Sequence, residues 1–146
     1  MREHRLALLV GLFIGASADA LADAYTTPYG EWRGQTQYQA IAKGESDPAA
    51  HAVINLVLNI EPGGKVSGGS PDNSCRLLGI AAPGVAPYIV TLNVTLTGCN
   101  YAGFNRTYNG HLTVFTEKKY ANLYLLAASA TPGKSGTFSI QSTLRR

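Results

Sequence analysis

Two cysteines, Cys75 and Cys99, enclose the clearest strand of this 146-residue chain. The segment 88–97 alternates apolar and polar side chains with the two-residue period of a half-buried strand. A shorter apolar run at 75–80 precedes it, across a loop rich in proline and glycine. Two such strands, if antiparallel, bring the cysteines to one end. We therefore predict a disulfide that closes a loop of about 25 residues and stabilises the fold by roughly 3 kcal/mol.

The first 24 residues have the pattern of a secretory signal peptide. Two arginines precede an apolar run at 6–14, and Ala-Asp-Ala at 22–24 has the Ala-x-Ala form of a cleavage site. The apolar run is too short to span about 30 Å of hydrocarbon. We expect residues 1–24 to direct export, and residues 25–146 to form a single periplasmic or secreted domain with no membrane span. An exported location also favours pairing of the two cysteines.

Strand-forming residues and turns alternate through the rest of the chain. Thr, Val, Tyr and Ile are frequent, and no window has the apolar period and caps of an amphipathic helix. The expected strands are 30–38, 52–60, 65–68, 75–80, 88–97, 107–115, 121–126 and 138–144. About eight short strands separated by turns predict an all-β domain, either a single antiparallel up-and-down β-barrel or a sandwich. A barrel has the advantage that it leaves no open edges.

The charged residues are sparse and scattered. The chain carries 12 Lys or Arg and 9 Asp or Glu. Two of the basic and three of the acidic residues lie in residues 1–24, so residues 25–146 have ten basic and six acidic side chains and a net charge of +4. A nucleic-acid-binding protein needs a concentrated basic face. Here no run of Lys or Arg exceeds two. We therefore expect no nucleic-acid partner.

Catalytic and metal-binding patterns are not found after the leader. A triad needs a nucleophile, a base and an orienting acid, and zinc needs three or four clustered ligands. The two histidines, His51 and His111, are sixty residues apart, and the carboxylates sit at strand ends or in turns. We expect no catalytic residue, metal site or cofactor, and a protein that is not an enzyme. A hydrolytic enzyme stays open as an alternative in which His111 meets a carboxylate and a hydroxyl.

Two segments that flank the cysteines are candidates for contact with a partner. The loop at 68–74 is polar, and the segment at 101–108 combines tyrosine with asparagine and arginine, a composition typical of contact surfaces. The predicted partner-binding residues are Asp72, Asn73, Tyr101, Phe104, Arg106 and Tyr108. In the alternative interpretation, Phe104 closes the end of the barrel and the tyrosines are half-buried strand residues.

The first expected strand opens with Gly30-Glu-Trp32. This resembles the start of lipocalins and avidins, the calycin group, in which a Gly-x-Trp motif begins the barrel and the tryptophan packs across its base. The resemblance implies a structural role for Trp32 and a small apolar ligand inside the barrel. The residues that would line such a cavity are Leu56, Leu92, Val94 and Leu112. In its turns and single disulfide, the chain is also similar to exported bacterial β-proteins of unassigned activity.

Three functions are therefore expected, in this order. The first is a non-catalytic periplasmic or secreted binding module, such as a protein inhibitor or immunity-type factor, whose partner is a protein or a component of the cell envelope. The second is a calycin-like barrel that holds a small apolar ligand in a cavity of order 300 Å³ or more. The third is a hydrolytic enzyme.

Overall fold

The computed structural model describes residues 27–42, 44–115, 117, 119–128 and 136–146; the predicted signal peptide, 1–24, lies outside them. Within the described residues the strands are β1 (Gly30–Ala42), β2 (Glu45–Ser46), β3 (Ala52–Ile60), β4 (Lys65–Ser70), β5 (Cys75–Pro83), β6 (Ile89–Thr97), β7 (Thr107–Phe115), β8 (Tyr120–Ala128) and β9 (Gly136–Arg145). Two single turns of 3₁₀-helix lie between strands, η1 (Pro71–Asn73) and η2 (Ala102–Phe104).

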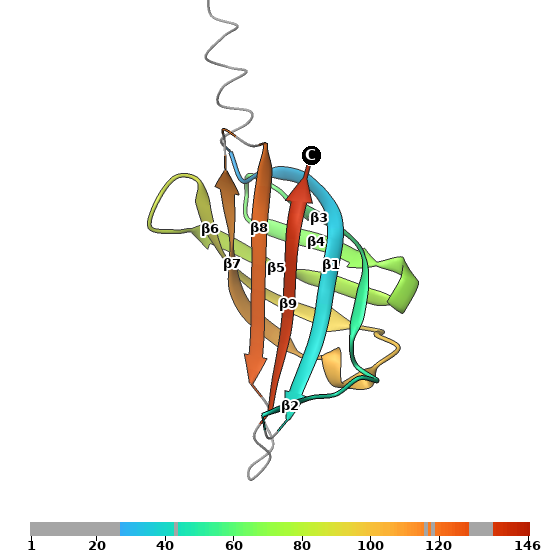
Figure 1. Ribbon diagram of the computed structural model, residues 1–146. Coiled ribbons are helices and arrows are strands. Elements are labelled where there is room, and N and C mark those ends of the chain that lie inside the picture. The colour runs from blue at the N-terminus through green and yellow to red at the C-terminus, as the bar shows by residue number, and fades with distance from the viewer. Residues whose placement is uncertain (1–26, 43, 116, 118, 129–135) are drawn as a thin grey trace, which may run out of the picture.

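Eight of these strands close into an antiparallel β-barrel. From β3 to β9, each strand pairs with the next along the chain, and β1 pairs with both β3 and β9. The short β2 pairs only with the end of β1. In Figure 1, β1, β8 and β9 run side by side at the front, while β4, β5 and β6 cross behind them. The up-and-down barrel is thus confirmed, and the pairing of β9 with β1 distinguishes it from a sandwich.

The strands lie where the sequence pattern predicts them, but β5, β8 and β9 are each longer than predicted, and the short β2 is not among the predicted strands. The strands β3 and β7 have the predicted limits, while β1 continues four residues further. The segment 68–74 was expected to be an irregular loop, but β4 continues to Ser70 and η1 follows it. Pairing of Ser70 with Cys75, and of Gly69 with Val57, provides backbone partners on both sides. Tertiary pairing therefore outweighs the low strand propensity of glycine here.

Side chains that point into the barrel form one core. Along β1, β3 and β6, buried and more exposed residues alternate as the sequence predicts. The largest fully buried side chains are Trp32, Tyr38, Tyr108, Phe104, Leu56, Leu58, Ile60, Leu96, Leu112, Leu125, Ile140 and Leu144. They come from β1, β3, β6, β7, β8, β9 and η2, and β4 and β5 add Val66 and Leu77 to the same core, so side chains from opposite walls occupy the interior.

An aromatic cluster closes the barrel at the end that carries the disulfide. Phe104 packs at a steep angle against Tyr38, Tyr101 and Phe138, with ring centroids 5.4 to 5.6 Å apart. The hydroxyl of Tyr108 donates a hydrogen bond to the carbonyl of Phe104 at 2.9 Å. Edge-to-face pairs of this kind are favourable beyond the area they bury. The cluster thus holds η2 across the mouth of the barrel.

Trp32 closes the opposite end. Its indole Nε1 donates to the carbonyl of Pro28 at 2.9 Å. The guanidinium of Arg146 lies 4.1 Å from the centroid of the Trp32 ring. The same guanidinium donates to the carbonyls of Tyr29 and Thr27. These contacts tie the end of the chain to the segment before β1, at the seam where β9 meets β1.

Candidate binding surface

The disulfide between Cys75 and Cys99 is present. It joins the start of β5 to the turn that follows β6, two segments that are 24 residues apart in the sequence. Both cysteines are buried. The prediction that these strands pair and bring the cysteines to one end is therefore confirmed.

The two predicted contact segments meet beside the disulfide. The backbone amide of Asn100 donates to the carbonyl of Asn73 at 2.9 Å, and the side-chain oxygen of Asn73 accepts a backbone hydrogen bond at the start of β5. Asp72 is exposed on η1. The hydroxyl of Tyr101 donates to the carboxylate of Asp47 at 2.7 Å, and this hydrogen bond raises the pKa of the Tyr101 phenol.

Two of the six predicted partner-binding residues lie in the core. Phe104 is 2% exposed and Tyr108 0% exposed. Burial of these large rings is favourable, and it closes this end of the barrel. The position of Phe104 agrees with the alternative interpretation of the segment, but Tyr108 is fully buried rather than half-buried, and Tyr101 is half-buried outside any strand. Arg106 lies 3.9 Å from the centroid of the Phe138 ring and donates to the carbonyl of Gly103. The four that remain at the surface are Asp72, Asn73, Tyr101 and Arg106.

The four residues that would line an internal ligand cavity are all buried. Leu56, Leu92, Val94 and Leu112 are at most 3% exposed and belong to the continuous core. Of these, Leu56 also borders a hollow beside η1. The groove described below lies on the outside of the barrel wall.

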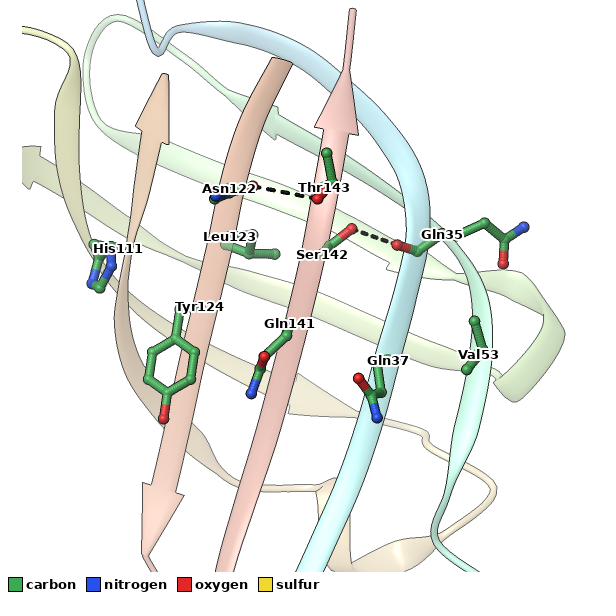
Figure 2. A pocket seen from close by; sticks show the side chains of 10 residues that line it. All are labelled: Gln35, Gln37, Val53, His111, Asn122, Leu123, Tyr124, Gln141, Ser142 and Thr143. Carbon is green, nitrogen blue, oxygen red and sulfur yellow. Dashed lines mark hydrogen bonds between the residues drawn. The ribbon is translucent and has the colours of Figure 1, made fainter. Parts of the chain in front are cut away.

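A groove of about 710 Å³ runs across the outer face of the barrel, over β7, β8, β9, β1 and β3 (Figure 2). Its lining residues are Gln35, Gln37, Val53, His111, Asn122, Leu123, Tyr124, Gln141, Ser142 and Thr143. All except Leu123 and Ser142 are exposed. The groove is therefore open to solvent and separate from the core.

The strand register aligns the middle of this groove as one row, which we call the central row. Across adjacent strands it runs through His111 (β7), Tyr124 (β8), Gln141 (β9), Gln37 (β1) and Val53 (β3). Figure 2 shows these side chains following one another over the outer wall. Because neighbouring strands lie about 4.8 Å apart, the row spans roughly 19 Å.

The central row has unused hydrogen-bonding groups. Within the part of the chain that the structure describes, the side chains of Gln37 and Gln141 and the hydroxyl of Tyr124 make no hydrogen bond to protein. The ring of His111 lies beside that of Tyr124, with centroids 6.0 Å apart. Two amides and an aromatic pair are thus available to a ligand.

The neighbouring row is held by hydrogen bonds between its own side chains. The amide of Gln35 donates to the side-chain oxygen of Asn55 at 2.9 Å. The hydroxyl of Thr143 donates to the side-chain oxygen of Asn122 at 3.3 Å (Figure 2). This row gives the groove an ordered border beside the unpaired central row.

The lining of the groove is polar but uncharged. None of its ten residues is Lys, Arg, Asp or Glu. His111 therefore has hydroxyl groups nearby in the lining but no carboxylate to orient it as a triad requires.

Among the described residues there is no cluster of three side chains able to hold a metal ion. In the same residues, no helix has the length and apolarity needed to cross a membrane.

Two smaller hollows lie beside η1, one over β3, β4 and β5 and the other over β1 and β3. One, of about 480 Å³, is bordered by Ser70 and Arg76. The other, of about 450 Å³, is bordered by Arg33 and Asp72. Both have charged residues in their lining, unlike the groove.

Sequence reasoning did not find the groove. The alternation along β1 places Gln35 and Gln37 on the outward face, but nothing in that pattern joins them to residues of other strands. His111, Tyr124 and Gln141 occur singly, with no motif around them. The five strands come together only through the pairing of β9 with β1, so the row is a product of barrel closure.

Comparison with known proteins identified no relative of this chain. The chain matches no protein-family model, no curated protein and no solved structure.

Proposed function

We propose that this chain is an exported, non-catalytic binding protein that recognises a macromolecule of the cell envelope or the extracellular space with the outside of its barrel wall. The observation that carries the proposal is the open groove of about 710 Å³, whose central row has hydrogen-bonding groups that no protein atom uses in the described residues. Concave sites with a few placed polar groups are typical of ligand binding. Export is supported by the leader pattern at 1–24 and by the disulfide, since disulfides persist in oxidising compartments.

The outer wall supports binding better than the interior does. A ligand inside the barrel, as the calycin resemblance implies, would have to displace buried side chains such as Leu92 and Leu112. Interiors are close-packed, and each displaced side chain loses its contacts. A ligand in the groove meets mainly exposed side chains and displaces none of the core.

An inhibitor or immunity-type role against an envelope enzyme is one form of this function. The loops beside the disulfide contribute Asp72 and Asn73, but Tyr101 and Arg106 are already engaged by Asp47 and by Phe138. Among the described residues, the amides of Gln37 and Gln141 in the central row have no such internal partners. We therefore place the contact in the groove and leave the loops beside the disulfide as a secondary surface.

Site-specific photo-crosslinking tests the proposed function. A photoreactive phenylalanine derivative replaces Gln141 in one exported variant and Leu78 in another. Leu78 is 60% exposed on β5 and lies outside the groove, which makes it a matched surface control. We expect a discrete crosslinked product from position 141 and none from position 78 in cells that export the protein.

A second variant separates binding from chance proximity. Gln37→Glu introduces a charge into the uncharged groove and should abolish the crosslink from position 141, because a carboxylate loses hydration without gaining a partner. Leu78→Glu should leave that crosslink unchanged. Equal crosslinking from positions 141 and 78, or a product that is insensitive to Gln37→Glu, would reject the groove as the binding surface.

A further inference from the structure

From the same groove we infer the class of its ligand: an uncharged, polyhydroxylated chain, that is, a neutral glycan. This inference rests on the proposed function and adds to it the chemistry of the partner. It depends on three properties of the groove, namely its charge, the pattern of its donors and acceptors, and its aromatic pair.

The lining of the groove has no Lys, Arg, Asp or Glu and therefore disfavours an ionic ligand. Arg33 and Glu31 form an ion pair at 2.5 Å elsewhere on β1. A charged group that enters a site without a counter-charge gives up hydration and gains no ion pair. A neutral ligand incurs no such penalty, so charge complementarity favours it.

The donors and acceptors match hydroxyl groups. A glutamine amide offers two donors and a carbonyl acceptor, and a hydroxyl offers one donor and two lone pairs. Gln37 and Gln141 are direct neighbours across β1 and β9, and within the described residues neither amide is used by the protein. Each of these two adjacent amides can donate a hydrogen bond to a hydroxyl and accept one from a hydroxyl. Beyond them, the bond from Gln35 to Asn55 holds a further amide pair in place.

The aromatic pair provides an apolar surface within this polar row. Tyr124 is 37% exposed, and its ring lies next to that of His111. Tyrosine combines an apolar ring with a polar hydroxyl, and the tyrosine hydroxyl has no protein partner in the described part of the chain. A sugar ring has the same division, with C–H groups on its faces and hydroxyls at its edge.

The shape of the groove suits a chain ligand. The central row crosses five strands over roughly 19 Å, which is enough for several sugar rings in succession. An extended peptide would normally be bound by strand addition at an open sheet edge. The barrel is closed by the pairing of β1 with β9, and the strands β7, β8, β9 and β1 under most of the groove pair with neighbours on both sides. Within the described residues, free strand edge is found in the two-residue β2 and in 52–56 of β3, which β4 does not reach.

Titration of the purified exported protein with defined oligosaccharides tests this inference. The neutral probes are cellohexaose, maltohexaose and fully N-acetylated chitohexaose, and the charged probes are hexameric alginate and hyaluronan. We expect saturable binding of at least one neutral probe, no binding of the charged ones, and NMR shifts of the side-chain amides of Gln37 and Gln141. Tyr124→Ala and the double variant Gln37→Ala/Gln141→Ala should each weaken binding about tenfold.

Tyr88→Ala is the matched control, because Tyr88 is 47% exposed but lies outside the groove; its binding should equal that of the wild type. Failure of every neutral probe to bind, or preference for a charged probe, would overturn the assignment to neutral glycans. If position 141 then still crosslinks to a protein or to a second copy of the chain, the outer-wall function stands and only the glycan class falls. If both experiments are negative, both proposals fall. Neutral binding that is unaffected by the Tyr124 and glutamine variants would remove the glycan from this groove.

Discussion

At the scale of single residues, the buried tyrosines link the core to its aromatic closure. Tyr108 is fully buried, and its hydroxyl donates to the carbonyl of Phe104. The hydroxyl of Tyr38 shares a hydrogen bond of 2.6 Å with the side chain of Ser70. Burial raises the pKa of both phenols, because a phenolate would lose its hydration inside the barrel. No buried side-chain nitrogen or oxygen among the described residues lacks a hydrogen-bond partner.

Burial of Tyr108 should make the free energy of unfolding fall at alkaline pH. Because the pKa of Tyr108 is raised in the folded state, the unfolded chain releases its proton first as pH rises above about 10. The free energy of unfolding should therefore hold below pH 10 and fall above it. Tyr108→Phe should cost about 1 kcal/mol at pH 7 through the lost hydrogen bond, and should make the alkaline decline shallower. Urea unfolding of both proteins between pH 7 and 11 measures this; parallel pH curves would contradict it.

At the scale of elements, close contact between strands depends on glycine. Gly110 in β7 shares the inward face with Tyr108 and Leu112. A Cβ added there would overlap the carbonyl oxygen of Tyr124 in β8. The same holds for Gly79 in β5, where a Cβ would meet the carbonyl of Asn93. Glycine at such positions lets neighbouring backbones approach where the sheet bends.

Gly110→Ala should therefore destabilise the barrel by about 1–3 kcal/mol, the usual cost of overpacking. Gly63→Ala is the control, since a Cβ in that turn between β3 and β4 meets no atom within 4 Å. It should be neutral, because it strains no packed contact. Denaturant midpoints of the two variants decide the matter. Equal midpoints would show that β7 can shift away from β8 without cost.

At the scale of the whole molecule, three long-range connections define the barrel. The pairing of β9 with β1 closes the sheet, and Arg146 ties the chain end to Trp32 at one mouth. At the other mouth, the disulfide between Cys75 and Cys99 holds the start of β5 against the turn after β6. These connections keep the wall closed, and the groove lies across the strands that meet at the seam.

The disulfide should be a large part of the total stability. Cys75→Ala/Cys99→Ala should lower the free energy of unfolding by roughly 3 kcal/mol, mainly because the unfolded chain regains its loop entropy. Against the typical 5–15 kcal/mol of a domain this is a substantial loss. Chemical denaturation of the double variant, and of the reduced wild type, measures the change. An unchanged midpoint in both would contradict a stabilising role.

Local patterns in the sequence were sufficient for the existence of the eight barrel strands and for the disulfide, but not for every strand end or for β2. Alternation at 52–60 and 107–115 predicts β3 and β7 to the residue, because a period of two depends only on neighbours in the chain. The pairing of the two cysteines follows once the strands between them are antiparallel, because both cysteines then lie at the same end. The all-β class follows from the same local information.

Only the tertiary structure decided which faces meet. The sequence is compatible with Tyr108 and Phe104 either in a partner-binding surface or in the core. Their burial depends on how η2 packs across the barrel mouth. The choice between barrel and sandwich depended on β9 reaching β1, a contact between the two ends of the domain. The central row joins His111, Gln141 and Gln37 by strand register, and register is set by hydrogen bonds between segments far apart in the chain. No local pattern encodes such an alignment, so the candidate site became visible only once the barrel was closed.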